Sequence, residues 1–196
     1  MTGVSPRVAF QGELGAFSEL AIRQCWGDTA HAVPCREFTD VVHAVTSGAV
    51  DAGVLPVENT IIGPIVAARA ALAAAGAAVT ITGETTVPIH PVLLACPGVT
   101  LADVRHVSSH PAALGQCAAF LARHPEWHIV VAYDTAGAAR DLAATSDMTH
   151  AVIASAAAAQ RYALHTLQTH VADREDNATT FVTIEPARVP AQPNRY

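Results

Sequence analysis

The stretch Asp51-Ala52-Gly53-Val54-Leu55-Pro56-Val57, followed by Glu58-Asn59-Thr60, decides the class of fold. An unbroken run of small and branched apolar residues is typical of a strand that is buried on both faces, as in sheets covered by helices on both sides. The polar residues come at the carboxyl end of this strand, where open α/β sheets bind ligands. The stretch therefore predicts an α/β fold and a candidate site at Glu58 and Asn59, although the same side chains also suit a plain loop with caps.

The composition agrees with an α/β fold. The chain is 51% hydrophobic but only 5% aromatic, so its apolar residues are mostly Ala, Val, Leu and Ile. A length of 196 residues is enough for one domain or two small lobes with a real core. The net charge of -6, without a basic stripe, gives no reason to expect a nucleic acid or a membrane as partner.

The cysteines and the N-terminus indicate a compartment. The four cysteines, Cys25, Cys35, Cys96 and Cys117, are widely spaced and form no CxxC or Cys/His pattern, so we expect buried free thiols and no metal site. Residues 1–7 lack the features of a signal peptide, and no apolar run reaches transmembrane length. A cytoplasmic protein is expected.

Strands and helices alternate along the rest of the chain. We expect strands at residues 8–10, 51–57, 79–81, 87–94, 128–133, 150–154 and 179–184, with a further strand ending near 109. Helices are expected at residues 18–25, 38–48, 63–76, 111–121, 134–142 and 155–162. The residues from Pro186 to Tyr196 contain three prolines and read as a surface tail.

Two further polar groups occupy positions comparable to Glu58-Asn59-Thr60. One is Ser109 with Gln116, where a strand ends and a helix starts; the plain alternative is that Ser109 only caps the helix and that the neighbouring His110 is likewise structural. The other is Thr179-Thr180, which follows a charged loop and begins the final strand, where Thr also suits β structure for its own sake.

The turn from Gln11 to Glu19 is a weaker candidate. Two glycines precede a helix that Ser18 or a neighbour caps, and helix N-terminal amides can hold a carboxylate of a ligand. A tight turn without a ligand is the alternative.

We expect two lobes that share a cleft. The chain crosses between them near Pro88 and Pro91 and returns in the final strand, so lobe 1 covers about 1–82 plus 178–196 and lobe 2 about 83–177. The three polar groups are predicted to converge in the cleft between these lobes.

With these motifs in view, the chain resembles the catalytic domain of prephenate dehydratases, which make phenylpyruvate on the route to phenylalanine. The resemblance rests on motifs in the same order along nearly the whole chain, namely Ala9-Phe10-Gln11-Gly12, Gly15-Ala16-Phe17-Ser18-Glu19, Gly53 to Thr60 with Gly63, Gly83-Glu84, Pro88-Ile89-His90, Ser109-His110-Pro111, Gln116-Cys117, Thr135-Ala136 before Ala138-Ala139, Ile153 to Ala157, Tyr162, Asp173 and Asn177.

The resemblance implies a fold, an activity and a set of partners. It implies two α/β lobes similar to type II periplasmic binding proteins, with the active site in the inter-lobe cleft. It implies a carbon–oxygen lyase that removes carbon dioxide and hydroxide from prephenate, or from a close analogue such as arogenate, without a cofactor. It also implies a homodimer or homotetramer whose partner is a small-molecule substrate.

The resemblance further implies roles for individual residues. Thr179 matches the family threonine that assists departure of the ring hydroxyl as a proton donor, and Glu58 and Asn59 join it as catalytic candidates. The substrate-binding candidates are Thr60, Ser109, His110, Gln116, Ser18, Thr180 and Phe181.

The chain departs from the family pattern at Thr180. The family typically has Thr-Arg-Phe where this chain has Thr179-Thr180-Phe181, so a guanidinium that can hold a carboxylate is replaced by a short hydroxyl. The candidates for a replacement cation are Arg69, Arg161, Arg174 and a protonated His110. A smaller departure is Ala112, where many relatives have Gln.

The family's regulatory ACT domain and its fused chorismate mutase domain have no counterpart in these 196 residues. We therefore expect a free-standing enzyme without phenylalanine feedback, in a specialised pathway.

Three functions stay open. The first is a dehydratase acting on prephenate or arogenate, which the retained Thr179 favours. The second is a non-aromatising prephenate decarboxylase that retains the hydroxyl, which the loss of arginine at Thr180 favours. The third is a binding protein that holds a carboxylate ligand in the cleft without chemistry, against which Thr179, Glu58 and Asn59 argue.

Overall fold

The structure is a computed structural model that describes residues 5–187. The strands are β1 (Arg7–Gln11), β2 (His31–Cys35), β3 (Ala52–Asn59), β4 (Gly63–Pro64), β5 (Val79–Pro88), β6 (Val92–Ala95), β7 (His106–Ser109), β8 (His128–Val131), β9 (His150–Ala154), β10 (His165–Gln168) and β11 (Ala178–Pro186). The α-helices are α1 (Phe17–Trp26), α2 (Phe38–Thr46), α3 (Val66–Ala75), α4 (Pro111–Gln116), α5 (Ala118–Leu121), α6 (Thr135–Thr145) and α7 (Ala156–Arg161). Short 3₁₀ turns lie at Gly27–Thr29, Gly76–Ala78 and Leu101–Asp103.

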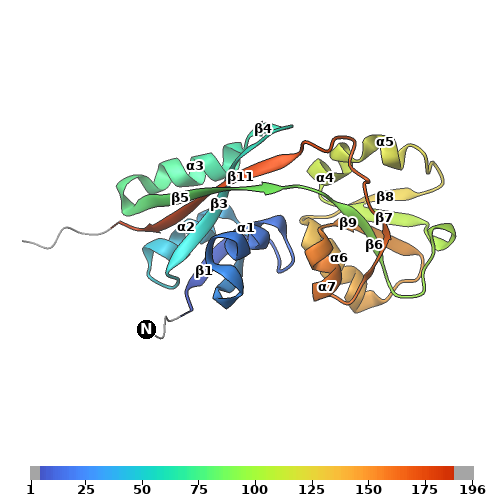
Figure 1. The fold of residues 1–196 in the computed structure, drawn as a ribbon, viewed down its shortest axis with the longest axis horizontal. Coiled ribbons are helices and arrows are strands. Elements are labelled where there is room, and N and C mark those ends of the chain that lie inside the picture. The colour runs from blue at the N-terminus through green and yellow to red at the C-terminus, as the bar shows by residue number, and fades with distance from the viewer. Residues whose placement is uncertain (1–4, 188–196) are drawn as a thin grey trace, which may run out of the picture.

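The strands form two separate sheets, one in each half of the molecule (Figure 1). The first sheet has the order β2-β1-β3-β11-β5, with β4 added to β3, and the second has the order β10-β6-β9-β7-β8. In the first sheet β1, β2 and β3 are parallel, while β11 is antiparallel to both of its neighbours. The two-lobed α/β architecture expected from the sequence is confirmed.

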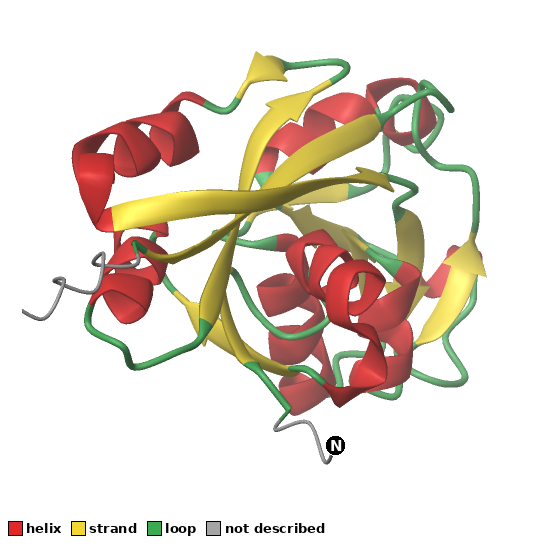
Figure 2. Ribbon diagram, turned by 60° about the vertical axis from the view of Figure 1, so that its left-hand side comes forward, coloured by secondary structure: helices red, strands yellow, loops and turns green. Residues whose placement is uncertain are grey.

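Helices cover both faces of the first sheet, which Figure 2 shows as a twisted sheet between helical layers. Phe10, Val54 and Phe181 pack toward α1, whereas Leu55 and Val182 pack toward α2 and α3 on the opposite face. A side chain at Gly53 would meet Val41 and Val45 at 2.9 Å, so glycine lets α2 lie directly on β3. The apolar run that opened the sequence analysis is therefore the central buried strand.

Local signals fix the beginnings of several helices. Glu37 and Asp40 form a capping box at α2. Asp134 accepts a hydrogen bond from the backbone N–H of Gly137 at the start of α6, and Ser155 accepts one from Ala158 at the start of α7.

Some expected elements differ in the structure. The strand expected to break at Gly83-Glu84 is one continuous strand, β5, because it pairs with β11 along nearly its whole length. The helix expected at residues 111–121 is interrupted at Cys117, which leaves α4 and α5, and Gly63-Pro64 forms β4 rather than the start of a helix. The strands β2 and β10 were not expected. Residues 188–196 of the expected tail lie outside the described residues.

Two segments connect the halves. The chain leaves the first sheet after Pro88 and enters the second at Val92, and it returns through residues 169–177 into β11. Figure 1 shows both connections on the same side of the molecule. The extent of β5 favours a lobe boundary nearer residue 89 than 82, and we keep the division into lobes as a proposal.

None of the helices within residues 5–187 combines the length and the hydropathy needed to cross a bilayer.

Candidate active site

One edge of the first sheet faces the second half of the molecule. The carboxyl ends of β1, β2 and β3 lie at this edge, and β11 begins there because Thr179 pairs with Asn59. The loop after β1 contacts the second half directly: Tyr162 donates a hydrogen bond to the carbonyl of Leu14 (2.7 Å), and the Ser155 hydroxyl donates one to the carbonyl of Gly15.

Asn59 is the centre of a buried hydrogen-bond network. Its Nδ2 lies 2.8 Å from Asn177 Oδ1, 2.9 Å from Thr179 Oγ1 and 3.0 Å from the carbonyl oxygen of Ala178. Its Oδ1 accepts hydrogen bonds from the backbone N–H groups of Ile61 and Ile62 (2.9 and 3.1 Å). Both ends of the amide are thus engaged, which fixes the side chain of this 4% exposed residue.

Thr179 receives a hydrogen bond and keeps its own proton. Its Oγ1 accepts from Asn59, and within residues 5–187 no acceptor is bonded to its hydroxyl. A hydroxyl whose oxygen is held by a donor has its proton free for a ligand. This arrangement is what a proton donor needs.

Asn177 extends the network to the second half. Its Nδ2 donates to Gln116 Oε1 (3.0 Å), and Gln116 is the last residue of α4. Thr60 fastens the same loop, since its hydroxyl donates to the carbonyl of Asp176 and accepts from the N–H of Ala178 (both 3.0 Å). Asn59, Thr60, Gln116 and Thr179 are therefore brought together at one place.

Glu58 lies opposite Thr180 in the register of β3 and β11, so the two side chains project from the same face of the sheet. Arg69, on α3, forms an ion pair with Glu58 and donates from Nε to the carbonyl of Val57 (2.7 Å). Its guanidinium is thus bonded to the residue that pairs with Thr180, and since Glu58 and Thr180 alternate with Asn59 and Thr179 along the strands, these two pairs point to opposite faces of the sheet. Another cation candidate, Arg174, forms an ion pair with Asp176 (2.6 Å).

Other predicted site residues have different surroundings. Ser109 is fully buried and its hydroxyl donates to the carbonyl of Ile153 (2.6 Å), while His110, not Ser109, caps α4 by accepting at Nδ1 from the N–H of Ala112. Ser18 lies in the first turn of α1, which begins after Ala16 without a side-chain cap. Phe181 is buried in the core against α1.

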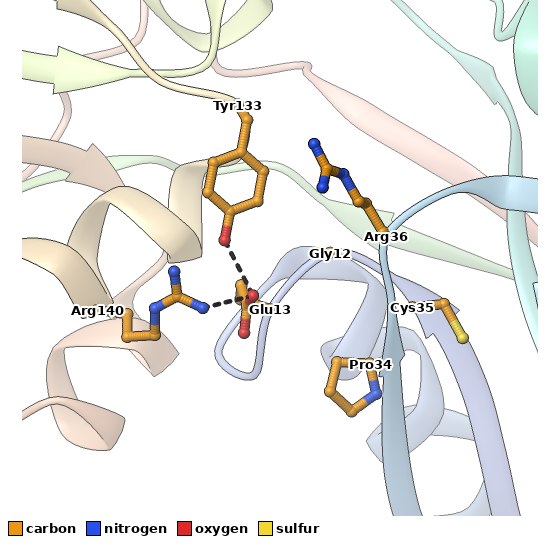
Figure 3. Close-up of a pocket in the computed structure, with 7 residues that line it drawn as sticks. All are labelled: Gly12, Glu13, Pro34, Cys35, Arg36, Tyr133 and Arg140. Carbon is orange, nitrogen blue, oxygen red and sulfur yellow. Dashed lines mark hydrogen bonds and ion pairs between the residues drawn. The ribbon is translucent and has the colours of Figure 1, made fainter. Parts of the chain in front are cut away.

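A cavity of about 410 Å³ opens at the ends of β1 and β2 (Figure 3). The first half contributes Glu13 and Arg36 to its lining, and the second half contributes Tyr133 and Arg140. Tyr133 donates to Glu13 Oε1 at 2.9 Å, and Arg140 donates to the same oxygen at 2.6 Å.

The sequence reasoning missed these cavity residues. Glu13 lies in the turn that the sequence predicts as a weaker candidate for its glycines and helix amides, not for its carboxylate. Tyr133 precedes the cap of α6, and Arg140 lies within that helix. Arg36 follows a strand that was not expected. If β2 had been predicted, the ends of three neighbouring parallel strands, β1, β2 and β3, would have indicated a ligand site that includes Glu13 and Arg36.

Burial alters two ionisable groups beside the cavity. It raises the pKa of Tyr133 to about 12, and the hydrogen bond to Glu13 acts in the same direction. Burial also raises the pKa of Asp134, partly offset by hydrogen bonds from the N–H groups of Gly137 and Glu13. Tyr133 is therefore a neutral hydrogen-bond donor at neutral pH.

The fold and this edge define the class of protein: a two-lobed α/β protein whose polar side chains gather between the lobes. The prephenate dehydratase family model matches residues 8–188. The chain belongs to the prephenate dehydratase family.

Individual relatives agree with this assignment. The chain is 38% identical to arogenate dehydratase 1 of Petunia hybrida, over 98% of this chain and 45% of that protein. It is 35% identical to a bifunctional N-acyl-homoserine lactone acylase/prephenate dehydratase of Komagataeibacter europaeus, over 93% of this chain and 64% of the relative. The crystal structure of prephenate dehydratase from Arthrobacter aurescens in complex with L-Phe superposes with a TM-score of 0.84 at 32% identity, over 97% of this chain and 63% of that one. The chain thus spans less than half of the Petunia enzyme and less than two thirds of the other two.

Proposed function

We propose that the protein is a carbon–oxygen lyase that converts arogenate or prephenate to phenylalanine or phenylpyruvate by coupled decarboxylation and dehydration. The observation that carries this proposal is the Thr179 hydroxyl, which accepts a hydrogen bond from the buried Asn59 and keeps its own proton free. It supports the role that family membership suggests for this threonine.

The reaction needs a proton at the oxygen that leaves. As carbon dioxide departs from the ring, electrons move through the ring and expel hydroxide, and donation from Thr179 neutralises the charge that develops on this oxygen. Asn59 orients the threonine and supports the oxygen that loses its proton. General-acid assistance of this kind contributes about 10²- to 10⁴-fold to a rate.

We propose that Arg69 supplies the positive charge that Thr180 lacks. Glu58 faces Thr180 across the two strands and already holds the guanidinium of Arg69. Arg174 pairs with Asp176, which among the described residues has no partner on the strand of Thr180, and His110 uses Nδ1 as an acceptor in the cap of α4, so both suit this role less well.

The two other functions that the sequence left open, a non-aromatising decarboxylase and a non-catalytic binding protein, are ranked below the dehydratase. A decarboxylase that retains the hydroxyl needs no proton at that oxygen, and family membership favours the dehydratase. A binding protein could use the Thr179 hydroxyl as a donor to a ligand, but membership of the prephenate dehydratase family favours an enzyme. The cytoplasmic location and the homodimer or homotetramer stay predictions.

We do not extend the acylase activity named for the Komagataeibacter relative to this chain. Ser108 lies 3.0 Å from His150 Nε2, and both line a cavity of about 470 Å³, but the name of one relative is no ground for assigning its acylase activity to this chain.

A product assay tests the proposal. The purified protein is incubated with prephenate and, separately, with arogenate, and the products are followed by mass spectrometry and by absorbance in alkali. Phenylpyruvate or phenylalanine supports the dehydratase. A decarboxylated product that keeps its hydroxyl supports the decarboxylase instead, and unchanged substrate in both reactions overturns both activities.

A further inference from the structure

The cavity at the ends of β1 and β2 has opposite charges on its two sides. In Figure 3, Arg36 lies on one side, Tyr133 and Arg140 come from the other half of the molecule, and Glu13 lies between the two arginines. The cavity is distinct from the residues around Thr179 but opens at the same edge of the same sheet.

The side with Glu13 carries an excess of carboxylates. Tyr133 and Arg140 both bond to Oε1 of Glu13, so within residues 5–187 its Oε2 has no hydrogen-bond partner. Asp134 lies against the backbone of Glu13 (N to Oδ2, 3.3 Å), and Asp141 shares Arg140 (Nη2 to Oδ1, 2.9 Å). Two carboxylates thus share the guanidinium of Arg140, and a third carboxyl group, Asp134, lies next to the Glu13 backbone, so a further cation would be stabilised there.

The opposite side carries a free guanidinium. Arg36 is exposed, and within residues 5–187 no carboxylate pairs with it. An unpaired arginine at the border of a cavity is suited to bidentate binding of a carboxylate.

We propose that this cavity binds the α-amino acid end of the substrate, with the ammonium group at Glu13 Oε2 and the α-carboxylate at Arg36. The inference rests on the proposed dehydratase function and selects its substrate: arogenate, which carries an amino group, rather than prephenate, which carries a keto group at the same carbon.

The position of the cavity suits a substrate whose ring lies at Thr179. The strand order β2-β1-β3-β11 places three strand spacings, about 14 Å, between the end of β2 and the start of β11. The side chains of Arg36 and Thr179 and a ligand of amino acid size together cover this span.

Charge explains why the amino group would be preferred. A keto group offers no positive charge to Glu13 and brings its own oxygen dipole toward a carboxylate. An ammonium group forms a charge-assisted hydrogen bond with Oε2, and such bonds are stronger than neutral ones. Arg36 binds the carboxylate of either substrate, so Glu13 sets the selectivity.

The test compares kcat/KM for arogenate and prephenate in the wild type, Glu13→Gln and Arg36→Gln. Glutamine at position 13 keeps an acceptor for Tyr133 and Arg140 but removes the charge. We expect Glu13→Gln to lower kcat/KM for arogenate by about ten- to a hundredfold, and to raise kcat/KM for prephenate slightly because the carboxylate no longer opposes the keto oxygen. Arg36→Gln lowers both. The exposed Glu84→Gln and Arg123→Gln are matched controls and change neither.

The outcomes separate this inference from the proposed function. Dehydration of both substrates with an arogenate-to-prephenate ratio that Glu13→Gln does not change overturns the inference and leaves the function standing. If neither substrate reacts, the function fails, and calorimetry decides about the cavity. Arogenate binding that is tighter than prephenate binding and is weakened in Glu13→Gln then supports the inference, and no binding of arogenate overturns it.

Discussion

The side of the first sheet where β1, β2 and β3 end and β11 begins has two differently built parts. In the part formed by β3 and β11, Asn59, Asn177 and Thr179 are buried, uncharged and bonded to one another. In the part formed by β1 and β2, Glu13 and Arg36 are charged and border an open cavity. The first part is suited to positioning one proton, and the second is suited to recognising charge.

The difference suggests that the groups for proton transfer and the groups for substrate recognition lie at separate places along the same side of the sheet. A fully bonded amide network holds its members in one arrangement, which is what proton transfer requires. Charged groups near solvent keep unused hydrogen-bonding capacity for a ligand. Removing groups in the first part should therefore affect turnover and stability, whereas changes in the second should affect selectivity and pH dependence.

The largest effect is expected for Thr179→Ala. Loss of the proton donor should lower kcat by about 10²- to 10⁴-fold, because hydroxide would then leave without assistance. Product formation from arogenate and prephenate measures this, and the melting temperature reports the fold. Thr179→Ser, which keeps the hydroxyl, is the control. Full turnover in the alanine variant would show that Thr179 is not the donor.

Asn59→Ala should lower the free energy of unfolding by about 3 kcal/mol, because it leaves the buried Asn177 Oδ1 and the N–H groups of Ile61 and Ile62 without partners. Urea denaturation measures the change. Gln116→Ala removes a single, partly buried bond and should cost about 1 kcal/mol. Equal losses in both variants would contradict the central position of Asn59.

Arg69→Ala should lower kcat/KM about tenfold if Arg69 replaces the family arginine. Thr180→Arg in the Arg69→Ala background should restore most of this loss, because it returns a guanidinium beside Glu58. Steady-state kinetics of the single and double variants provide the comparison, with Arg123→Ala as the control. Wild-type kinetics in Arg69→Ala would remove Arg69 from the site.

The smallest effect is expected in the pH dependence of the free energy of unfolding, and Asp134 beside the charged cavity is its cause. Burial raises the pKa of Asp134 above its ordinary value of 3.8, so its protonated form stabilises the folded state. This contribution is complete below pH 3.8 and is lost as the pH rises through the raised pKa of the folded state.

Asp134→Asn keeps a helix cap but does not titrate. Its free energy of unfolding relative to the wild type should therefore rise between pH 4 and pH 7, as urea denaturation at the two pH values would show. A difference that does not change with pH would mean that the pKa of Asp134 is not raised in the folded state.

The strongly patterned parts of the fold were predictable. The run from Ala52 to Val57 is apolar without interruption, and the start of α6 has an Asp cap. These signals are local, so they can be read from neighbouring residues. By contrast β5 contains Gly83 and two prolines lie near its end, and only pairing with β11 makes it one strand.

The sequence by itself determined the α/β class, the family motifs and the place of Glu58, Asn59 and Thr60 at a strand end, because each depends on residues that are adjacent in the chain. Only the tertiary structure decided that Asn59 bonds to Thr179, that Arg69 pairs with Glu58 opposite Thr180, and that Glu13 and Arg36 border one cavity. Those contacts join segments that are distant in sequence, and they follow from strand order and from the packing of the two halves.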